Sequence, residues 1–213
     1  MTDIKLSKDH IYTVDGIKKI SVTQVIQEYG LSDFSMINEQ VLKNAMAIGT
    51  AVHLLCELFD KDMPDKIDKI LNHISEDGTK KNGILKPYLD AWIKYQTEYQ
   101  IGLSEVEKIY YSKTWDYCGK IDRILQENGI LSVVEIKTVT VLQKSVGIQL
   151  AAYKNLYDEN NKEKIKDRIA VQLCPDGNYN RVEYKDKNDI NVFKCMMTIL
   201  NYKKNSGILK GDK

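Results

Sequence analysis

The feature that most constrains the fold is a run of short, strand-like segments between residues 103 and 138. Three segments are rich in β-branched and aromatic residues, and they read VEKIYYS (106–112), GKIDRIL (119–125) and LSVVEIKT (131–138). Asp116–Gly119 separates the first two. The last two are separated by Asn128-Gly129, the strongest short-range signal for a β-hairpin turn. The pattern predicts three consecutive antiparallel strands.

Other segments flank this meander on both sides. Before it, Asp15-Gly16 marks the turn of a short hairpin, and Ser21 can cap a helix that Gly30 ends. The apolar spacing predicts the remaining helices and strands: helices over 38–59, 84–99, 144–157 and 190–202, and strands over 168–174 and 181–184 on either side of a turn at 175–178. This order predicts a mixed α/β (α+β) fold.

We expect one domain over 1–213. Its parts would be a helical N-terminal portion (1–100), a sheet core (101–185) and a C-terminal helix and tail (186–213). No stretch approaches the roughly 20 apolar residues of a membrane span, so no membrane segment is expected. The N-terminus, MTDIKLSKDH, lacks the basic start and apolar block of a signal peptide. An intracellular protein is therefore expected.

Charge and cysteine content exclude some classes of ligand and leave others open. The 31 basic and 30 acidic residues leave a net charge of +1, which neither supports nor excludes nucleic-acid binding. The four cysteines are far apart and form no Cys-x-x-Cys pair; they are Cys56, Cys118, Cys174 and Cys195. A zinc ribbon and a thioredoxin-like motif are therefore excluded, and a clustered iron–sulfur site is unsupported.

The chemistry is concentrated in Glu135-Ile136-Lys137 and in Asp122 on the preceding strand. Because side chains alternate along a strand, Glu135 and Lys137 share one face. Neighbouring strands lie about 4.8 Å apart, so Asp122 and Glu135 can converge on one ion. Two carboxylates suit Mg²⁺, and a nearby lysine can stabilise charge on a phosphate. Taken alone, the same pattern is also typical of a solvated strand face.

The surroundings of these residues favour the functional interpretation. Gln149 and Tyr153 are four residues apart, so they share one helix face. An acidic residue on the strand before Asp122 can assist the site, and here Glu107 and Glu105 remain alternatives. Upstream, a helix carries Gly49, His53 and Glu57 on one face; an isolated histidine among leucines and valines would more often be a core residue.

These motifs together resemble a known family. In order they are Gly49-x-x-x-His53-x-x-x-Glu57, Val106-Glu107, Gly119-x-x-Asp122, Glu135-x-Lys137-Thr138 and Gln149-x-x-x-Tyr153. The set resembles the PD-(D/E)XK nuclease superfamily in its RecB-like exonuclease branch. The segment IYTVDGIKKISVTQVI (11–26) also looks like the N-terminal part of phage-encoded and mitochondrial members. The resemblance covers roughly residues 10–160.

The resemblance implies a restriction-endonuclease-like core, with a central mixed sheet flanked by helices, and Mg²⁺ or Mn²⁺ as cofactor without an iron–sulfur cluster. The implied metal ligands are His53, Asp122, Glu135 and the backbone carbonyl of Ile136. The implied catalytic residues are Asp122, Glu135, Lys137, Gln149 and Tyr153, supported by the acids Glu57 and Glu107. Gln149 and Tyr153 are also implied DNA contacts.

Tyr117 is a further candidate for contact with DNA. It belongs to an aromatic group near the first hairpin: Tyr110, Tyr111, Trp115 and Tyr117. Such rings can stack on unpaired bases, which contributes about 1–3 kcal/mol each. Packing within the sheet is the favoured interpretation of the group, because strands favour aromatic residues.

The expected function is therefore metal-dependent hydrolysis of DNA from its ends, in phage or mobile-element recombination or replication. A structure-specific endonuclease with the same site is one alternative. A DNA-binding or interaction module that kept the fold without catalysis is another. The expected partners are DNA and a single-strand annealing protein or another recombination protein, in the cytoplasm of a bacterial host.

Overall fold

One open, eight-stranded mixed sheet organises the part of the chain that this computed structural model describes, which is residues 2–32, 37–73 and 81–208. Its strands are β1 (Ile4–Leu6), β2 (Tyr12–Val14), β3 (Ile17–Ser21), β4 (Gly102–Ser112), β5 (Tyr117–Glu127), β6 (Ile130–Lys137), β7 (Asp167–Leu173) and β8 (Tyr179–Glu183). The order is β1-β2-β3-β5-β6-β7-β8, with β4 paired to β5. The predicted mixed α/β fold is confirmed.

The predicted three-strand meander is confirmed as β4-β5-β6, all antiparallel. The turn between β5 and β6 places Asn128 at φ 50° and Gly129 at φ 78°. Both values lie in the left-handed region, as a two-residue hairpin turn requires. The strands extend beyond the predicted segments, and β5 begins at Tyr117 within the stretch that was expected to separate it from β4.

One edge of β5 is interrupted, and this interruption positions the site. On one side β4 pairs with β5 over most of its length. On the other side, β3 runs parallel to β5 at Tyr117–Cys118, whereas β6 pairs with it only from Arg123 onward. Residues 119–122 of β5 therefore have no strand partner on this second edge among the described residues. Asp122 lies at the end of this gap.

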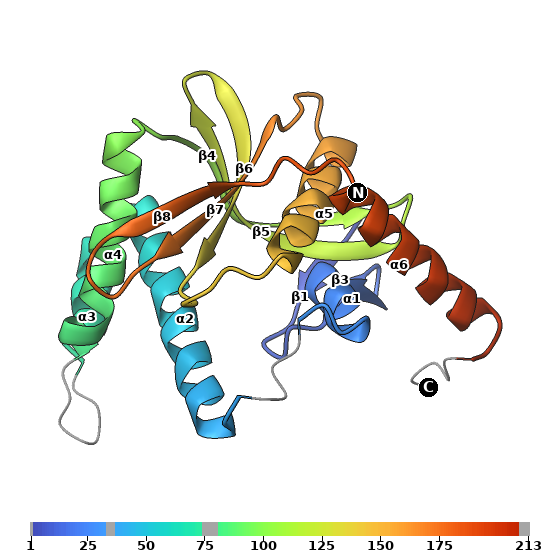
Figure 1. Cartoon of the computed structure of the whole chain (residues 1–213), viewed down its shortest axis with the longest axis horizontal. Helices are drawn as coiled ribbons and strands as arrows, with labels where there is room; N and C mark the ends of the chain where they lie inside the picture. Colours follow the sequence, from blue (N-terminus) through green and yellow to red (C-terminus); the bar gives the residue numbers. More distant parts are fainter. Residues whose placement is uncertain (1, 33–36, 74–80, 209–213) are drawn as a thin grey trace.

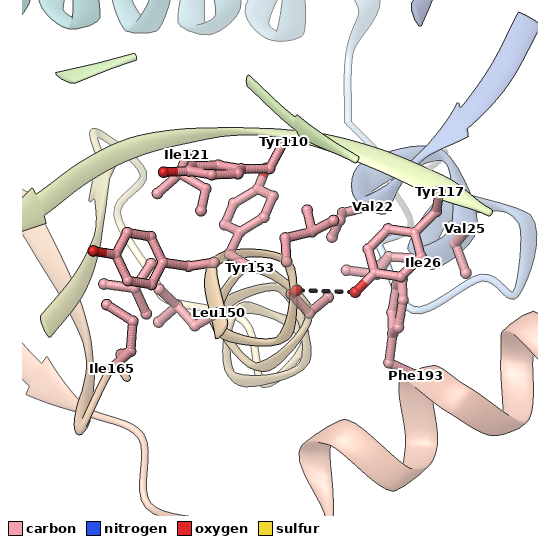
Figure 2. Close-up of a cluster of buried hydrophobic side chains, with 14 of the residues drawn as sticks. Val22, Val25, Ile26, Tyr110, Tyr117, Ile121, Leu150, Tyr153, Ile165 and Phe193 are labelled. Atoms are coloured by element: carbon pink, nitrogen blue, oxygen red, sulfur yellow. Dashed lines mark hydrogen bonds between the residues drawn. The ribbon is translucent and has the colours of Figure 1, made fainter. Parts of the chain in front are cut away.

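Helices cover both faces of the sheet (Figure 1). Those on one side are α2 (Glu39–Asp60), α3 (Pro64–Leu71) and α4 (Lys81–Glu98), and those on the other are α1 (Val22–Glu28), α5 (Ser145–Asn160) and α6 (Asp189–Asn205). Each side has its own hydrophobic cluster. Trp92 and Leu55 are fully buried in the first, and Leu150 and Phe193 in the second (Figure 2).

Helix ends follow the predicted signals closely. Ser21 caps α1 through a capping box with Gln24, and Asn38 caps α2. α4 begins three residues before the predicted start, and α3 was not predicted. Strands β1–β3 extend the central sheet, so the N-terminal portion is not purely helical. Of the predicted tail, residues 209–213 lie outside the described residues, and α6 continues to Asn205.

One described helix, α2, is long and apolar enough by length and composition to cross a membrane, although no such segment was expected. This criterion is weak, because helices of a soluble core also meet it. In the structure, α2 buries Val52, Leu55 and Cys56 against the domain.

Candidate active site

Three side chains from three different elements meet beside the gap in β5. They are His53 of α2, Glu107 of β4 and Asp122 of β5, and one ligand atom from each lies within 4.8 Å of the others. His53 Nδ1 is 3.6 Å from Asp122 Oδ2 and 3.9 Å from Glu107 Oε1. An imidazole and two carboxylates at this spacing form a donor set that can hold a divalent cation.

A close approach between α2 and β6 brings His53 to the sheet. Gly49 lies one turn before His53, and a Cβ built on it would be 3.4 Å from Thr138 Oγ1. That distance is at the tight limit of ordinary van der Waals contact. Gly49 therefore faces Thr138, the residue that follows β6.

The backbone at Glu107 is unusual and decides which acid enters the site. Its φ of 52° lies in the left-handed region, which glutamate rarely adopts. Glu105 instead accepts hydrogen bonds from Tyr110 and Lys108, away from the cluster. Glu107, not Glu105, is therefore the acidic residue at the site. Strained backbone of this kind is concentrated at functional sites.

Asp122 replaces a missing strand partner. Its Oδ2 accepts a hydrogen bond of 2.9 Å from the backbone N–H of Ile136. β5 and β6 have already separated at this point, so the carboxylate satisfies an amide that the ladder leaves free. This contact also places Asp122 next to Glu135, as the two-carboxylate interpretation requires.

A second group of side chains connects β6 to α5. Lys137 Nζ donates to Glu135 Oε1 at 2.8 Å and to Gln149 Oε1 at 3.1 Å. Gln149 Nε2 in turn donates to Glu135 Oε1 at 2.9 Å and to the Tyr153 hydroxyl at 3.2 Å. The predicted shared faces of Glu135 with Lys137, and of Gln149 with Tyr153, are both confirmed.

Gly119 allows α5 to come this close. A Cβ built on Gly119 would lie 2.7 Å from Leu156 Cδ1 and 2.8 Å from Tyr153 Cε1, distances that real Cβ atoms essentially never show. The glycine of the Gly119-x-x-Asp122 motif therefore seats the helix that carries Gln149 and Tyr153. Its role is close packing, with no special backbone conformation.

The charges of the cluster perturb its protonation. Burial raises the pKa of Asp122 to about 7, and the charge of Glu135 adds to this effect. Burial works against protonated His53, but Asp122 and Glu107 outweigh it and raise the pKa of His53 to about 9. For Glu107, burial is outweighed by His53 and Lys120, which lower its pKa to about 2. Such opposed shifts are typical of functional sites.

A buried, unpaired oxygen of Glu135 tests whether the residues fit a metal. Glu135 Oε2 has no hydrogen-bond partner in the structure. A buried, unpaired carboxylate oxygen is costly unless a cation satisfies it. Together with the cluster of His53, Glu107 and Asp122, this oxygen fits a divalent ion.

No role was predicted from the sequence for Lys120 and Arg123, which contact Glu107, or for Asp60, which pairs with Arg123. Lys120 Nζ lies 2.6 Å from Glu107 Oε2, and Arg123 Nη1 donates to Glu107 Oε1 at 2.8 Å. Arg123 also pairs with Asp60, and neither side chain is exposed. Arg123 stands between Asp122 and Ile124 in a buried strand, where a charged residue needs a partner. A charged residue in this strand was therefore the sequence signal for such a partner.

Tyr117 was expected as a DNA contact, and the structure corrects this. Its side chain has no exposed surface, and its hydroxyl donates to the Ala152 carbonyl at 3.0 Å (Figure 2). Packing, the favoured interpretation of the aromatic group, therefore holds for Tyr117. Tyr153 lies in the same buried cluster with 5% of its surface exposed, so it supports Gln149 and offers little surface to DNA.

Three expected roles stay predictions. Glu135 lies outside the cluster of three ligand groups, so its role as a metal ligand is untested. Glu57 lies one turn beyond His53, outside the cluster of three, and pairs with Lys61. The backbone of Ile136 lies at the centre of the site through its N–H, but no described contact tests its carbonyl as a ligand.

Comparisons with known proteins gave one family match and two structural neighbours. A model of the PD-(D/E)XK nuclease superfamily matches residues 27–193. A crystal structure from Eubacterium rectale, provisionally named an exonuclease, aligns over 91% of this chain and 76% of its own, with a TM-score of 0.48 and 13% identity. The crystal structure of SSO0001 aligns over 84% of both chains, with a TM-score of 0.34 and 16% identity.

TM-scores below 0.5 carry no argument about function. No curated protein matches the chain. The superfamily match is different, because it spans most of the chain and includes every residue of the site. The chain belongs to the PD-(D/E)XK nuclease superfamily.

Proposed function

We propose that this protein is a divalent-metal-dependent DNA exonuclease, which hydrolyses phosphodiester bonds from DNA ends. One observation carries the proposal. Glu135 offers one oxygen to Lys137 and Gln149, while its other oxygen is buried and unpaired in the same site as the cluster of three ligand groups. This arrangement combines candidate metal ligands with a positive charge held beside them, and both can stabilise the charge that develops on a phosphate during hydrolysis.

The cluster of His53, Glu107 and Asp122 would hold the ion. Glu135, which lies outside that cluster, would add its unpaired oxygen as a further ligand. A bound divalent ion would act as a Lewis acid toward the phosphate and lower the pKa of water. The carboxylates suit Mg²⁺ and Mn²⁺ alike, whereas an imidazole favours the softer Mn²⁺.

The remaining residues act through position and charge. Lys137 is held by Glu135 and Gln149, so its ammonium group is fixed where it can stabilise charge that develops on the phosphate. Burial opposes the charge of Lys137, but Glu135 outweighs it and raises the pKa of the lysine, which therefore stays protonated. Gln149 fixes both partners through its amide, and the Tyr153 hydroxyl orients that amide.

The second part of the proposal is that the nuclease acts at DNA ends. The sequence offers no zinc finger or other base-reading module, so affinity for DNA would come from phosphate contacts, which carry no sequence information. A nuclease without sequence specificity is tolerated in a cell only if something else restricts it. A requirement for a free end supplies such a restriction.

The test uses linear, end-labelled DNA and covalently closed circular DNA in one reaction, with Mg²⁺, with Mn²⁺ and with chelator. We expect stepwise loss of the linear DNA with either metal and survival of the circle. Nicking of the circle at a comparable rate would replace exonuclease with structure-specific endonuclease. Binding without cleavage under every condition would favour the non-catalytic module.

The biological setting belongs to the same proposal. The resemblance of residues 11–26 to phage-encoded relatives supports a role in phage or mobile-element recombination or replication. A single-strand annealing protein, or another recombination protein, would then be the partner in the cytoplasm of the host. Co-purification with such a protein encoded beside this one would test this.

A further inference from the structure

Besides His53, Glu107 contacts a lysine and an arginine that differ in burial. Its Oε1 accepts from Arg123 Nη1 at 2.8 Å, and the Arg123 side chain has no exposed surface. Its Oε2 lies 2.6 Å from Lys120 Nζ, and 35% of the Lys120 side chain is exposed. Lys120 can therefore move away from Glu107 more easily than Arg123 can.

Arg123 is fixed in place by a second buried acid. Its Nε donates to Asp60 Oδ2, and the Asp60 side chain is also fully buried. Asp60 Oδ1 accepts from Trp92 Nε1 at 2.9 Å and from Gln96 Nε2 at 2.6 Å. Separating a buried ion pair leaves an uncompensated charge, so Arg123 remains with Glu107 whatever binds at the site.

Lys120 has no such anchor. Within the described part of the chain, Lys120 forms one recorded ion pair, which is with Glu107. Its ammonium group sits on a flexible four-carbon stem that is partly open to solvent. A divalent cation held by His53, Glu107 and Asp122 would bring two positive charges to the carboxylate that Lys120 occupies. Like charges repel, so the ion pair of Lys120 would weaken when the metal binds.

We propose that Lys120 is a substrate-binding residue that exchanges partners: it pairs with Glu107 in the metal-free protein and binds a phosphate of the DNA backbone once a metal occupies the site. The proposal rests on the proposed function for its substrate class. It makes metal binding and DNA binding mutually reinforcing. The metal releases Lys120 to the DNA, and the DNA withdraws Lys120 from Glu107. Reciprocity requires that each ligand strengthen the other by the same factor.

The exchange gives a pair of effects with opposite signs. Lys120→Met removes a cation that competes for Glu107, so the metal should bind more tightly. The same change removes a phosphate contact, so DNA should bind more weakly when metal is present. A purely structural role for Lys120 would weaken both.

Two titrations test this. Calorimetry with Mn²⁺ alone measures metal affinity, and fluorescence anisotropy with a dye-labelled duplex measures DNA affinity in Ca²⁺ and in chelator. We expect Lys120→Met to bind Mn²⁺ at least about fivefold more tightly and DNA about fivefold more weakly in Ca²⁺, the low end of typical coupling between ligands. In chelator its DNA affinity should equal wild type. In Ca²⁺, the slope of log DNA affinity against log salt concentration should decrease by about 1, as expected when one phosphate contact is lost.

Two further variants serve as controls. Lys108→Met removes another partly exposed lysine that pairs with a glutamate, Glu105, but outside the cluster. It should change neither titration. Lys120→Arg keeps the charge and should keep the DNA affinity in Ca²⁺. Melting temperatures of all variants identify any that do not fold.

The outcomes separate this inference from the proposed function. Weaker Mn²⁺ binding by folded Lys120→Met, or an unchanged salt dependence, would overturn the partner exchange. If the wild type binds DNA and metal with the expected coupling but cleaves no DNA, the proposed function fails and the exchange stands. Cleavage by the wild type without the opposite-sign effects would sink the exchange alone.

Discussion

Replacement of Gly119 by alanine tests how the fold controls the site. The added Cβ would lie 2.7 Å from Leu156 Cδ1 and 2.8 Å from Tyr153 Cε1. Both side chains belong to the buried cluster between β5 and α5, so neither can swing into solvent. The helix must move away from the strand, or the two side chains must leave their positions.

The magnitude follows from these overlaps. Inserting one methyl group into a packed core typically costs about 1–3 kcal/mol. For a domain of this size, each kcal/mol lowers the melting temperature by about 2–4 °C, so we expect a loss of about 4–8 °C for a cost near the middle of that range. Because Tyr153 orients Gln149, the same movement should also slow DNA cleavage. A shift of less than 1 Å should cost less than about 10²-fold.

The assay pairs thermal denaturation with cleavage of end-labelled DNA, and a matched control is available in α4. A Cβ on Gly83 would meet nothing within 4 Å. Gly83→Ala should therefore stabilise the protein by up to about 1 kcal/mol through helix propensity. Wild-type stability of Gly119→Ala would refute the packing argument. Lower stability with unchanged cleavage would refute the link between α5 and the site.

Three other predictions concern the charges of the site. Lys137→Ala should slow cleavage by about 10²–10³-fold in single-turnover assays at saturating metal; near-normal rates would make Lys137 an ordinary charge. Asp60→Ala should cost about 3–5 kcal/mol in urea denaturation, because Arg123 stays buried without its partner; a cost below about 1 kcal/mol would show that Glu107 suffices. Because His53 and Asp122, with pKa values raised to about 9 and about 7, must lose protons to hold a cation, Mn²⁺ affinity should rise with pH across this interval. Calorimetry in buffers of different ionisation enthalpy measures the proton release, and a pH-independent affinity would contradict it.

The sequence predicts the elements that depend on local signals. Asn128-Gly129 fixed the hairpin between β5 and β6, and the alternation of Glu135 with Lys137 fixed their shared face. Ser21 and Asn38 acted as helix caps because their side chains bond to nearby backbone N–H groups. Each of these depends on a few neighbouring residues.

Features that depend on distant contacts could not be predicted in this way. The choice of Glu107 over Glu105 follows from the left-handed backbone at Glu107, which no sequence signal marks. The burial of Arg123 requires Asp60, which lies 63 residues away in the chain. For Tyr117, aromatic composition alone cannot distinguish a ring that stacks on a base from one packed beneath a helix.

The short helix α3 was missed for a different reason. It is eight residues long and follows α2 closely, with Asp62 in the left-handed conformation between the two. Lysines and aspartates make up half of its sequence, so its few apolar residues give no clear helical pattern. Of these apolar residues, Leu71 is buried. Short helices of this kind depend on tertiary packing more than on intrinsic propensity.

The hydrogen bond between Ile136 N and Asp122 Oδ2 makes one backbone amide a spectroscopic probe of the site. The ¹⁵N–¹H signal of Ile136 depends on the charge and position of the carboxylate that accepts its proton. Titration with a diamagnetic ion such as Mg²⁺ should therefore shift this signal before any substrate is added. Metal occupancy can then be followed in a variant that no longer cleaves DNA, which separates binding from chemistry without an attached dye.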